Sequence, residues 1–225
     1  MTGHRNHGRK WIGALCALTA ALGAQDRTVL AALTTTGPLT TIQGPLAGKR
    51  TPVWRHGSLL MLDESAPSSP LITALDINGK PSASVPVRVP GAVKVHLRGY
   101  TRTMEGDFVV CGGAFDVEDR QAPFIALISQ DGARAQIVRP ERYFPERIAV
   151  SDSGAIWTLG LTIPADRWVR DLEEGIIRRF GRDGKLEAKF IPGTMIGDMR
   201  RVREGGLLVA DDRVGWFSTG MDERV

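Results

Sequence analysis

Three stretches of the chain carry charged side chains suited to ligand recognition, and two of them add an aromatic residue. The most distinctive is Trp168, which stands among arginines and can stack on a sugar or a peptide group. The candidate ligand-binding residues are Asp119, Arg120, Arg142, Tyr143, Asp166, Arg167, Trp168 and Arg170. They predict recognition of a protein, a peptide or a glycan, without a cofactor.

No complete catalytic set can be assembled from the sequence. Catalysis needs an acid, a base and a nucleophile that converge, and no Gly-x-Ser-x-Gly, His-Glu-x-x-His or phosphate-loop motif is present. Carboxylate pairs such as Asp63-Glu64 and Glu173-Glu174 are chain neighbours, which point to opposite faces of a strand. A recognition or scaffold module is therefore favoured. The alternative is a lactonase-like or glycan-active hydrolase or lyase, with catalytic residues split among repeats and some of them outside this chain.

The sequence also predicts no metal site. After the first 24 residues only His56, His96 and Cys111 remain as nitrogen and sulfur ligands, and their spacing matches no zinc motif. Cys111 ends the apolar run that begins at Phe108, so we expect a buried, small hydrophobic side chain there.

The elements that would position the candidate residues recur along the chain. Glycine opens an apolar run at Gly57, Gly106, Gly154 and Gly206, with spacings of 49, 48 and 52 residues. Turn dipeptides at 78–79, 131–132 and 183–184 keep nearly the same period. A fixed period of about 20–50 residues is typical of solenoids, propellers and arrays.

One repeat, residues 98–140, predicts four strands. The first covers Tyr100 to Met104, and the second, Phe108 to Cys111, is apolar throughout, as in a strand covered on both faces. The third covers Phe124 to Ile128. Asp131-Gly132 then supplies a hairpin turn, and the fourth strand covers Ala135 to Val138.

The neighbouring repeats fit the same plan. Pro86 lies in the fourth strand of the first repeat, and proline is confined to edges and bulges of sheets. That strand is therefore outermost, with Val85, Val87 and Val89 directed inward. In the third repeat, residues 186–190 alternate like a half-buried outer strand. We predict an all-β fold, an array of four-stranded antiparallel β-propeller blades, in preference to a solenoid or a sandwich.

Loop positions follow from this plan. In a four-stranded meander the connections between second and third strands emerge on the same face as those between repeats. The candidate residues fall in these connections, where binding residues concentrate on a rigid scaffold. We therefore expect one recognition face, which bears the long second-to-third-strand loops. The tryptophans Trp54, Trp157 and Trp216 are predicted to be core residues, and Asp131, Asp152 and Asp183 to shape turns.

Two segments of the third repeat resemble a known family. Ser151-Asp-Ser-Gly-Ala-Ile-Trp157 and Ile176-Ile-Arg-Arg-Phe-Gly-Arg-Asp-Gly184 resemble the repeats of NHL-type and SMP-30-type propeller proteins. The resemblance covers roughly residues 50–217 and implies a propeller, usually six-bladed. The Asp-x-x-Asn-x-Arg stretch of NHL repeats is replaced after Trp157 by an insertion, and the Glu, Asn and Asp metal ligands of SMP-30-type lactonases have no matching positions.

The repeats occupy residues 50–97, 98–146, 147–197 and, in part, 198–225, after a lead-in segment at 25–49. Three full repeats and a partial fourth form an incomplete ring. An exposed sheet edge favours aggregation, so we expect either a truncated propeller or a homodimer that closes the ring.

The first 24 residues have the features of a secretory signal peptide. A basic lead precedes an apolar run from Trp11 to Ala24 that ends in small residues. This run is shorter than the roughly 20 residues of a membrane span, so we expect export to the periplasm or the extracellular space without stable membrane insertion. The chain has 29 basic and 25 acidic residues, and loss of the leader removes three basic ones, which leaves 26 against 25. Such a balance provides no electrostatic basis for nucleic-acid binding.

Overall fold

The computed structural model describes residues 52–163, 173–195, 206–210 and 213–217. The chain divides into two compact units, Met1–Ile42 and Gln43–Val225, and every described residue belongs to the second. The predicted signal peptide and the lead-in segment lie outside the described residues. The described residues form an all-β unit of four antiparallel sheets.

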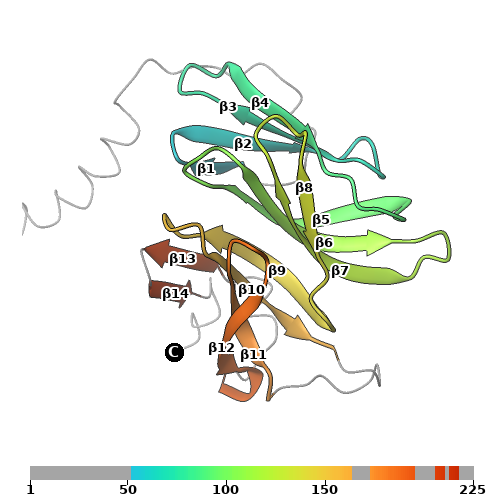
Figure 1. Cartoon of the computed structure of the whole chain (residues 1–225), viewed down its shortest axis with the longest axis vertical. Coiled ribbons are helices and arrows are strands. Elements are labelled where there is room, and N and C mark those ends of the chain that lie inside the picture. The colour runs from blue at the N-terminus through green and yellow to red at the C-terminus, as the bar shows by residue number, and fades with distance from the viewer. Residues whose placement is uncertain (1–51, 164–172, 196–205, 211–212, 218–225) are drawn as a thin grey trace, which may run out of the picture. The chain divides into compact units, whose positions relative to one another are not determined.

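The first two sheets are four-stranded meanders (Figure 1). The first runs β1 (Val53–Arg55), β2 (Ser58–Asp63), β3 (Leu71–Leu75) and β4 (Pro81–Pro86). The second runs β5 (Lys94–Arg102), β6 (Phe108–Phe115), β7 (Gln121–Ile128) and β8 (Ala135–Val138). Strand order in each sheet follows chain order, so the predicted meander is confirmed in both.

The third sheet repeats the plan, and the fourth has two described strands. The third runs β9 (Tyr143–Val150), β10 (Ile156–Thr162), β11 (Gly175–Phe180) and β12 (Leu186–Pro192), and the short 3-10 helix η1 (Gly193–Met195) follows. The fourth pairs β13 (Gly206–Ala210) with β14 (Arg213–Phe217).

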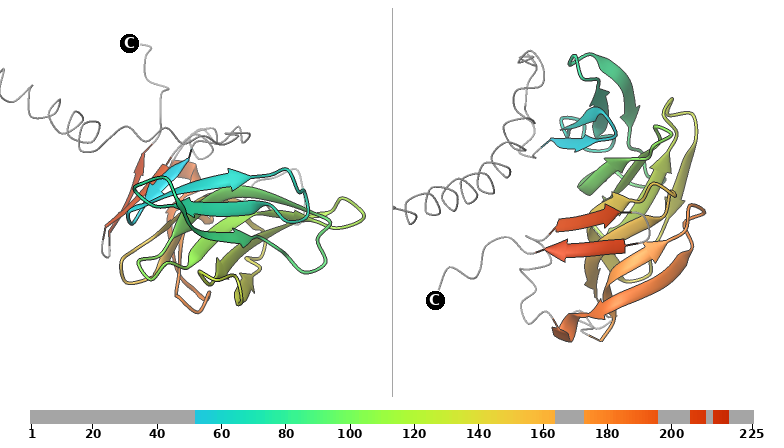
Figure 2. Two further views of the ribbon diagram at one scale, coloured as in Figure 1. Left: turned by 90° about the horizontal axis from the view of Figure 1, so that it is seen from above. Right: turned by 90° about the vertical axis from the view of Figure 1, so that its left-hand side faces the viewer.

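The sheets pack face to face in chain order (Figure 2). Strand β6 shows how: Phe108 and Val110 belong to a cluster shared with the first sheet, whereas Val109 and Cys111 belong to a cluster shared with the third. All four side chains are fully buried, and burial stabilises each of the larger ones by roughly 1.5–3 kcal/mol. The prediction that this strand is covered on both faces, with Cys111 in the core, is confirmed.

The predictions for β4 and for the turn dipeptides are confirmed, whereas the predicted half-buried alternation of residues 186–190 is wrong, because Leu186 and Phe190 are 43% and 40% exposed. Pro86 ends the edge strand β4, and Val85, Val87 and Val89 are buried. Gly79, Gly132 and Gly184 have φ between 72° and 76°, as the turn dipeptides require. Asp131 and Asp183 accept bonds from nearby backbone amides. In the turn between β9 and β10, however, the side chain that accepts a bond from a backbone amide is that of Ser151 rather than Asp152. The amide of Ala155 donates to the Ser151 hydroxyl at 3.0 Å.

The tryptophan predictions hold in two cases and fail in one. Trp157 is 3% exposed, and the partly buried Trp216 packs against the same cluster. Trp54 was predicted to be core, but it is 57% exposed. The reason is its strand: β1 is the first strand of its sheet, and Trp54 lines an open hollow rather than the contact between two sheets.

Candidate binding groove

The connections between second and third strands lie at the same end of the sheets as those between sheets. The amide of Ile163, just after β10, donates to the carbonyl of Arg142, just before β9, at 2.7 Å. The amide of Val93, before β5, likewise donates to the carbonyl of Phe115, at the end of β6, at 2.8 Å. The predicted sharing of one face by both kinds of loop is therefore confirmed for these two repeats.

Half of the predicted site residues lie outside the described residues: Asp166, Arg167, Trp168 and Arg170. Asp119 and Arg120 lie in the connection between β6 and β7. Asp119 has φ of 56° and occupies a tight turn, with its amide bonded to the carbonyl of Asp116. Arg120 is ion-paired with Asp116 at 2.8 Å and Glu118 at 2.9 Å. Bonds from the Arg120 backbone and side chain lower the pKa of Asp116, so Arg120 is held by carboxylates of its own loop.

Tyr143 is not a loop residue, as the sequence suggested, but the first residue of β9, and its side chain is fully buried. Its hydroxyl donates to the carbonyl of Ile176 at 2.9 Å and lies 3.0 Å from the Thr158 hydroxyl. Burial raises the pKa of the phenol well above its usual value. The prediction that Tyr143 contacts ligand is replaced by a structural role, because its ring and hydroxyl are enclosed by the third sheet.

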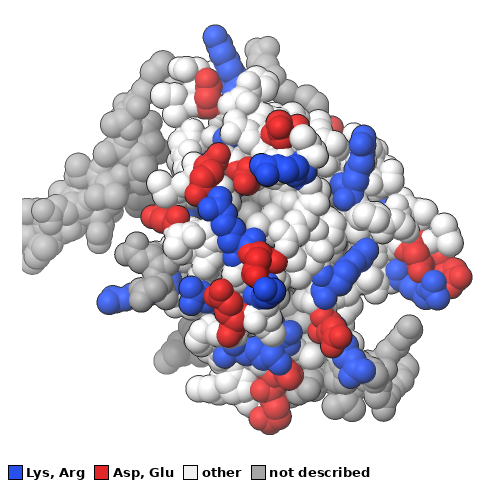
Figure 3. Space-filling view, viewed as in Figure 1, with Lys and Arg blue, Asp and Glu red and all other residues white. Residues whose placement is uncertain are grey.

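Arg142 is exposed and lines a groove between the second and third sheets. The groove has a volume of about 620 Å³ and runs beside β8, β11 and β12. Its charged lining residues are Arg139, Glu141, Arg142, Glu174, Arg178 and Lys189. Four cations therefore face two carboxylates, which leaves the groove with two excess positive charges. On the face seen in Figure 3, charges of both signs are interspersed.

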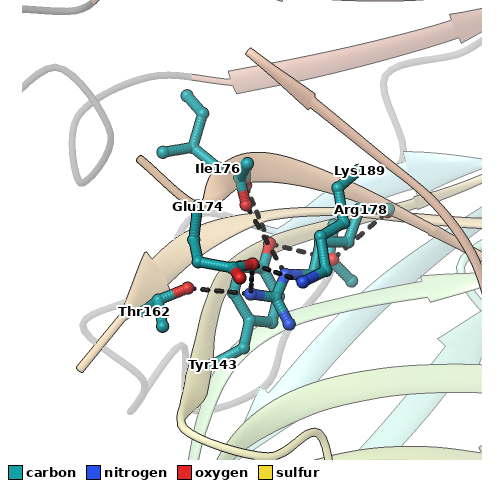
Figure 4. A network of polar contacts seen from close by, with 8 residues as sticks. Tyr143, Thr162, Glu174, Ile176, Arg178 and Lys189 are labelled. Atoms are coloured by element: carbon teal, nitrogen blue, oxygen red, sulfur yellow. Dashed lines mark hydrogen bonds and ion pairs between the residues drawn. The ribbon is translucent and has the colours of Figure 1, made fainter. Parts of the chain in front are cut away.

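Arg178 lines this groove, and Figure 4 shows the polar contacts that hold it. Its side chain is only 6% exposed, and its guanidinium lies 4.0 Å from the centre of the Tyr143 ring. Its Nη2 donates to Thr162 Oγ1 at 2.8 Å and to Glu174 Oε2 at 3.2 Å. Since a buried charge is costly unless it is paired and hydrogen-bonded, these contacts explain how the guanidinium is tolerated and why its position is fixed.

Glu174 lies between the buried Arg178 and the more exposed Lys189. Its carboxylate also pairs with Lys189 of β12. The hydrogen bond from Lys189, and then the charges of Lys189 and Arg178, lower the pKa of Glu174. The carboxylate therefore stays ionised at neutral pH and holds both cations beside the groove.

Sequence reasoning missed Arg178 and Lys189 because both lie in strands. Arg178 and Arg179 are adjacent, yet the first is buried in the third sheet and the second is half-exposed. The alternation of a strand is the one signal that separates them, because neighbours on a strand point to opposite faces.

No family model matches the chain, and no curated protein matches it. In the part of the chain that the structure describes, no three His, Cys, Asp or Glu side chains gather as ligands for a metal ion. Within the same residues, no helix has the length and apolar character needed to cross a bilayer.

Proposed function

We propose that this chain is an exported β-propeller-type recognition module that binds an anionic segment of a protein, peptide or glycan partner. The groove between the second and third sheets is the binding site. Three four-stranded meanders stacked face to face support the propeller assignment. The leader-like residues 1–24 support export. Immunoblots that compare the size of the protein from export-competent and export-blocked cells would test this.

The observation that carries this proposal is the excess of positive charge in a groove with a fixed wall. Arg178 is held by Tyr143, Thr162 and Glu174, so little side-chain freedom is lost there on binding. Arg139 and Arg142 are exposed lining residues of the groove, and Arg139 makes only a long bond of 3.5 Å to the Pro90 carbonyl, so both can reach an incoming carboxylate, sulfate or phosphate group. Arginine suits this task because its planar guanidinium donates two parallel hydrogen bonds to such groups.

The test compares two double variants of equal charge change. Arg139→Gln/Arg142→Gln removes the two exposed cations of the groove. Lys80→Gln/Arg134→Gln removes two exposed cations near the hairpins between third and fourth strands, away from the groove. A heparin hexasaccharide and an octaglutamate peptide serve as probes, with octalysine as the negative control, and binding is followed by isothermal titration calorimetry.

We expect the groove variant to bind the preferred anionic probe about 2- to 30-fold more weakly, since an exposed charge pair contributes roughly 0.2–1 kcal/mol. The control variant should bind as the parent does, and added salt should weaken parent binding. Equal losses in both variants, or tighter binding of octalysine, would refute the proposal. Preference for heparin or octaglutamate would decide between a glycan and a protein segment.

A further inference from the structure

We propose that a second hollow, bounded by the first strands of three sheets and by β13, binds a small organic anion with an apolar or aromatic body. Residues of β1, β5, β9 and β13 line it, and its volume is about 520 Å³. Small-ligand sites commonly measure about 300–1,000 Å³ and combine apolar walls with a few polar groups. This site shares no lining residue with the groove, so it stands or fails independently of the proposed function.

Corresponding irregularities in β5 and β9 bring two charged side chains together beside the hollow. The pairing of β5 with β6 shifts register at Arg98, and the pairing of β9 with β10 shifts register at Glu146. A bulge leaves one residue outside the ladder and redirects its side chain. The two redirected side chains approach each other, with Arg98 Nη1 3.9 Å from Glu146 Oε2.

Three arginines are among the lining residues of the hollow: Arg55, Arg98 and Arg147. Backbone carbonyls hold two of them: Arg55 Nη2 donates to Val150 O at 2.6 Å, and Arg147 Nη1 donates to Glu146 O at 2.8 Å. Arg98 is 46% exposed, whereas Glu146 is 13% exposed. Backbone carbonyls therefore fix Arg55 and Arg147, and the Glu146 carboxylate beside Arg98 is largely withdrawn from solvent.

Two large apolar side chains share this hollow with the arginines. Trp54 is 57% exposed and Leu208 is 66% exposed. Ile148, a further lining residue, is half-buried and packs against the cluster shared by the second and third sheets. A hollow whose lining includes an exposed tryptophan and three arginines favours a ligand that combines a flat apolar body with one negative charge. An inorganic anion would leave the apolar surface exposed to water.

The probes that test this site are 1-naphthaleneacetate and its neutral analogue 2-(1-naphthyl)ethanol, titrated into the full chain by isothermal calorimetry. We expect the carboxylate to bind at least about tenfold more tightly than the alcohol. Equal affinities would overturn the charge assignment, and no saturable binding of either probe would overturn the site.

Variants locate the binding. Arg98→Gln should reduce carboxylate affinity about tenfold and leave alcohol affinity unchanged, and Arg98→Lys should restore part of the loss. Trp54→Ala should weaken both probes. Arg88→Gln, an exposed cation that does not line the hollow, is the matched control and should change neither. An unchanged carboxylate affinity in Arg98→Gln, in a variant with the parent melting temperature, would overturn the proposal.

Discussion

Replacing Tyr143 by Phe separates its structural role from ligand binding. The substitution keeps the ring under the Arg178 guanidinium, 4.0 Å away, and removes only the buried hydroxyl. Two contacts are lost, one to the Ile176 carbonyl at 2.9 Å and one to the Thr158 hydroxyl at 3.0 Å.

The expected loss of stability follows from these two contacts. A neutral hydrogen bond contributes about 0.5–1.5 kcal/mol, and a buried group left without its partner costs about 1–3 kcal/mol. The Thr158 hydroxyl lies 3.4 Å from the Arg178 carbonyl and retains that acceptor, which limits the loss on its side. We therefore expect Tyr143→Phe to lower the free energy of unfolding by about 1–3 kcal/mol.

Urea denaturation followed by tryptophan fluorescence measures this loss. With a urea dependence of about 2 kcal/mol per M, the midpoint should fall by roughly 0.5–1.5 M at an unchanged slope. Thr73→Val is the control: it removes an exposed hydroxyl contact with Ser84 at 3.0 Å and should shift the midpoint little. Affinity for the anionic probes should be unchanged in Tyr143→Phe. A midpoint equal to the parent's together with lost probe binding would refute the structural assignment.

Three further predictions concern the groove, the sheet contacts and the assembly. The pKa of Glu174 is lowered in the folded state, so its contribution to stability is present above the ordinary pKa near 4.5 and is lost as pH falls through the folded value. The difference in the free energy of unfolding between the parent and Glu174→Gln should therefore shrink below about pH 4.5. A difference that stays constant with pH would contradict this. Gly184→Ala should lower the melting temperature more than Gly57→Ala does. Both glycines have positive φ, but a Cβ at 184 would overlap Val138, whereas the space around 57 is open. Equal losses would show that backbone strain alone matters. Light scattering after size exclusion should give the mass of a dimer if a second copy closes the ring, and a monomer mass would remove that prediction.

Much of the sheet plan could be predicted from the sequence because it rests on local signals. The predicted strand from Ala135 to Val138 coincides with β8, since Asp131-Gly132 fixes its start and Pro140 limits its end. The apolar run from Phe108 correctly predicted a strand packed on both faces, although β6 extends to Phe115. This extension could not be predicted, because Gly112 and Gly113 have no side chains and so interrupt the apolar pattern. Glycine is needed there because neighbouring atoms approach both positions closely.

The candidate site was less predictable because it depends on which face each strand residue meets. Arg142 was named correctly as a loop residue, whereas its neighbour Tyr143 is enclosed by the third sheet. Trp54 is a large aromatic residue of the kind usually found in a core. It lies on the first strand of its sheet, however, and that strand borders a hollow. The register shift that redirects Arg98 depends on pairing with β6, so no local pattern could reveal it.

Hydrogen–deuterium exchange with and without the preferred anionic probe tests the proposed binding groove most directly. Bound probe should slow exchange in peptides that cover residues 138–142 and 174–189, which line the groove. Peptides that cover the hairpins at 76–80 and 129–134 should exchange at the same rate in both states. Protection confined to those hairpins, with none beside the groove, would contradict the account.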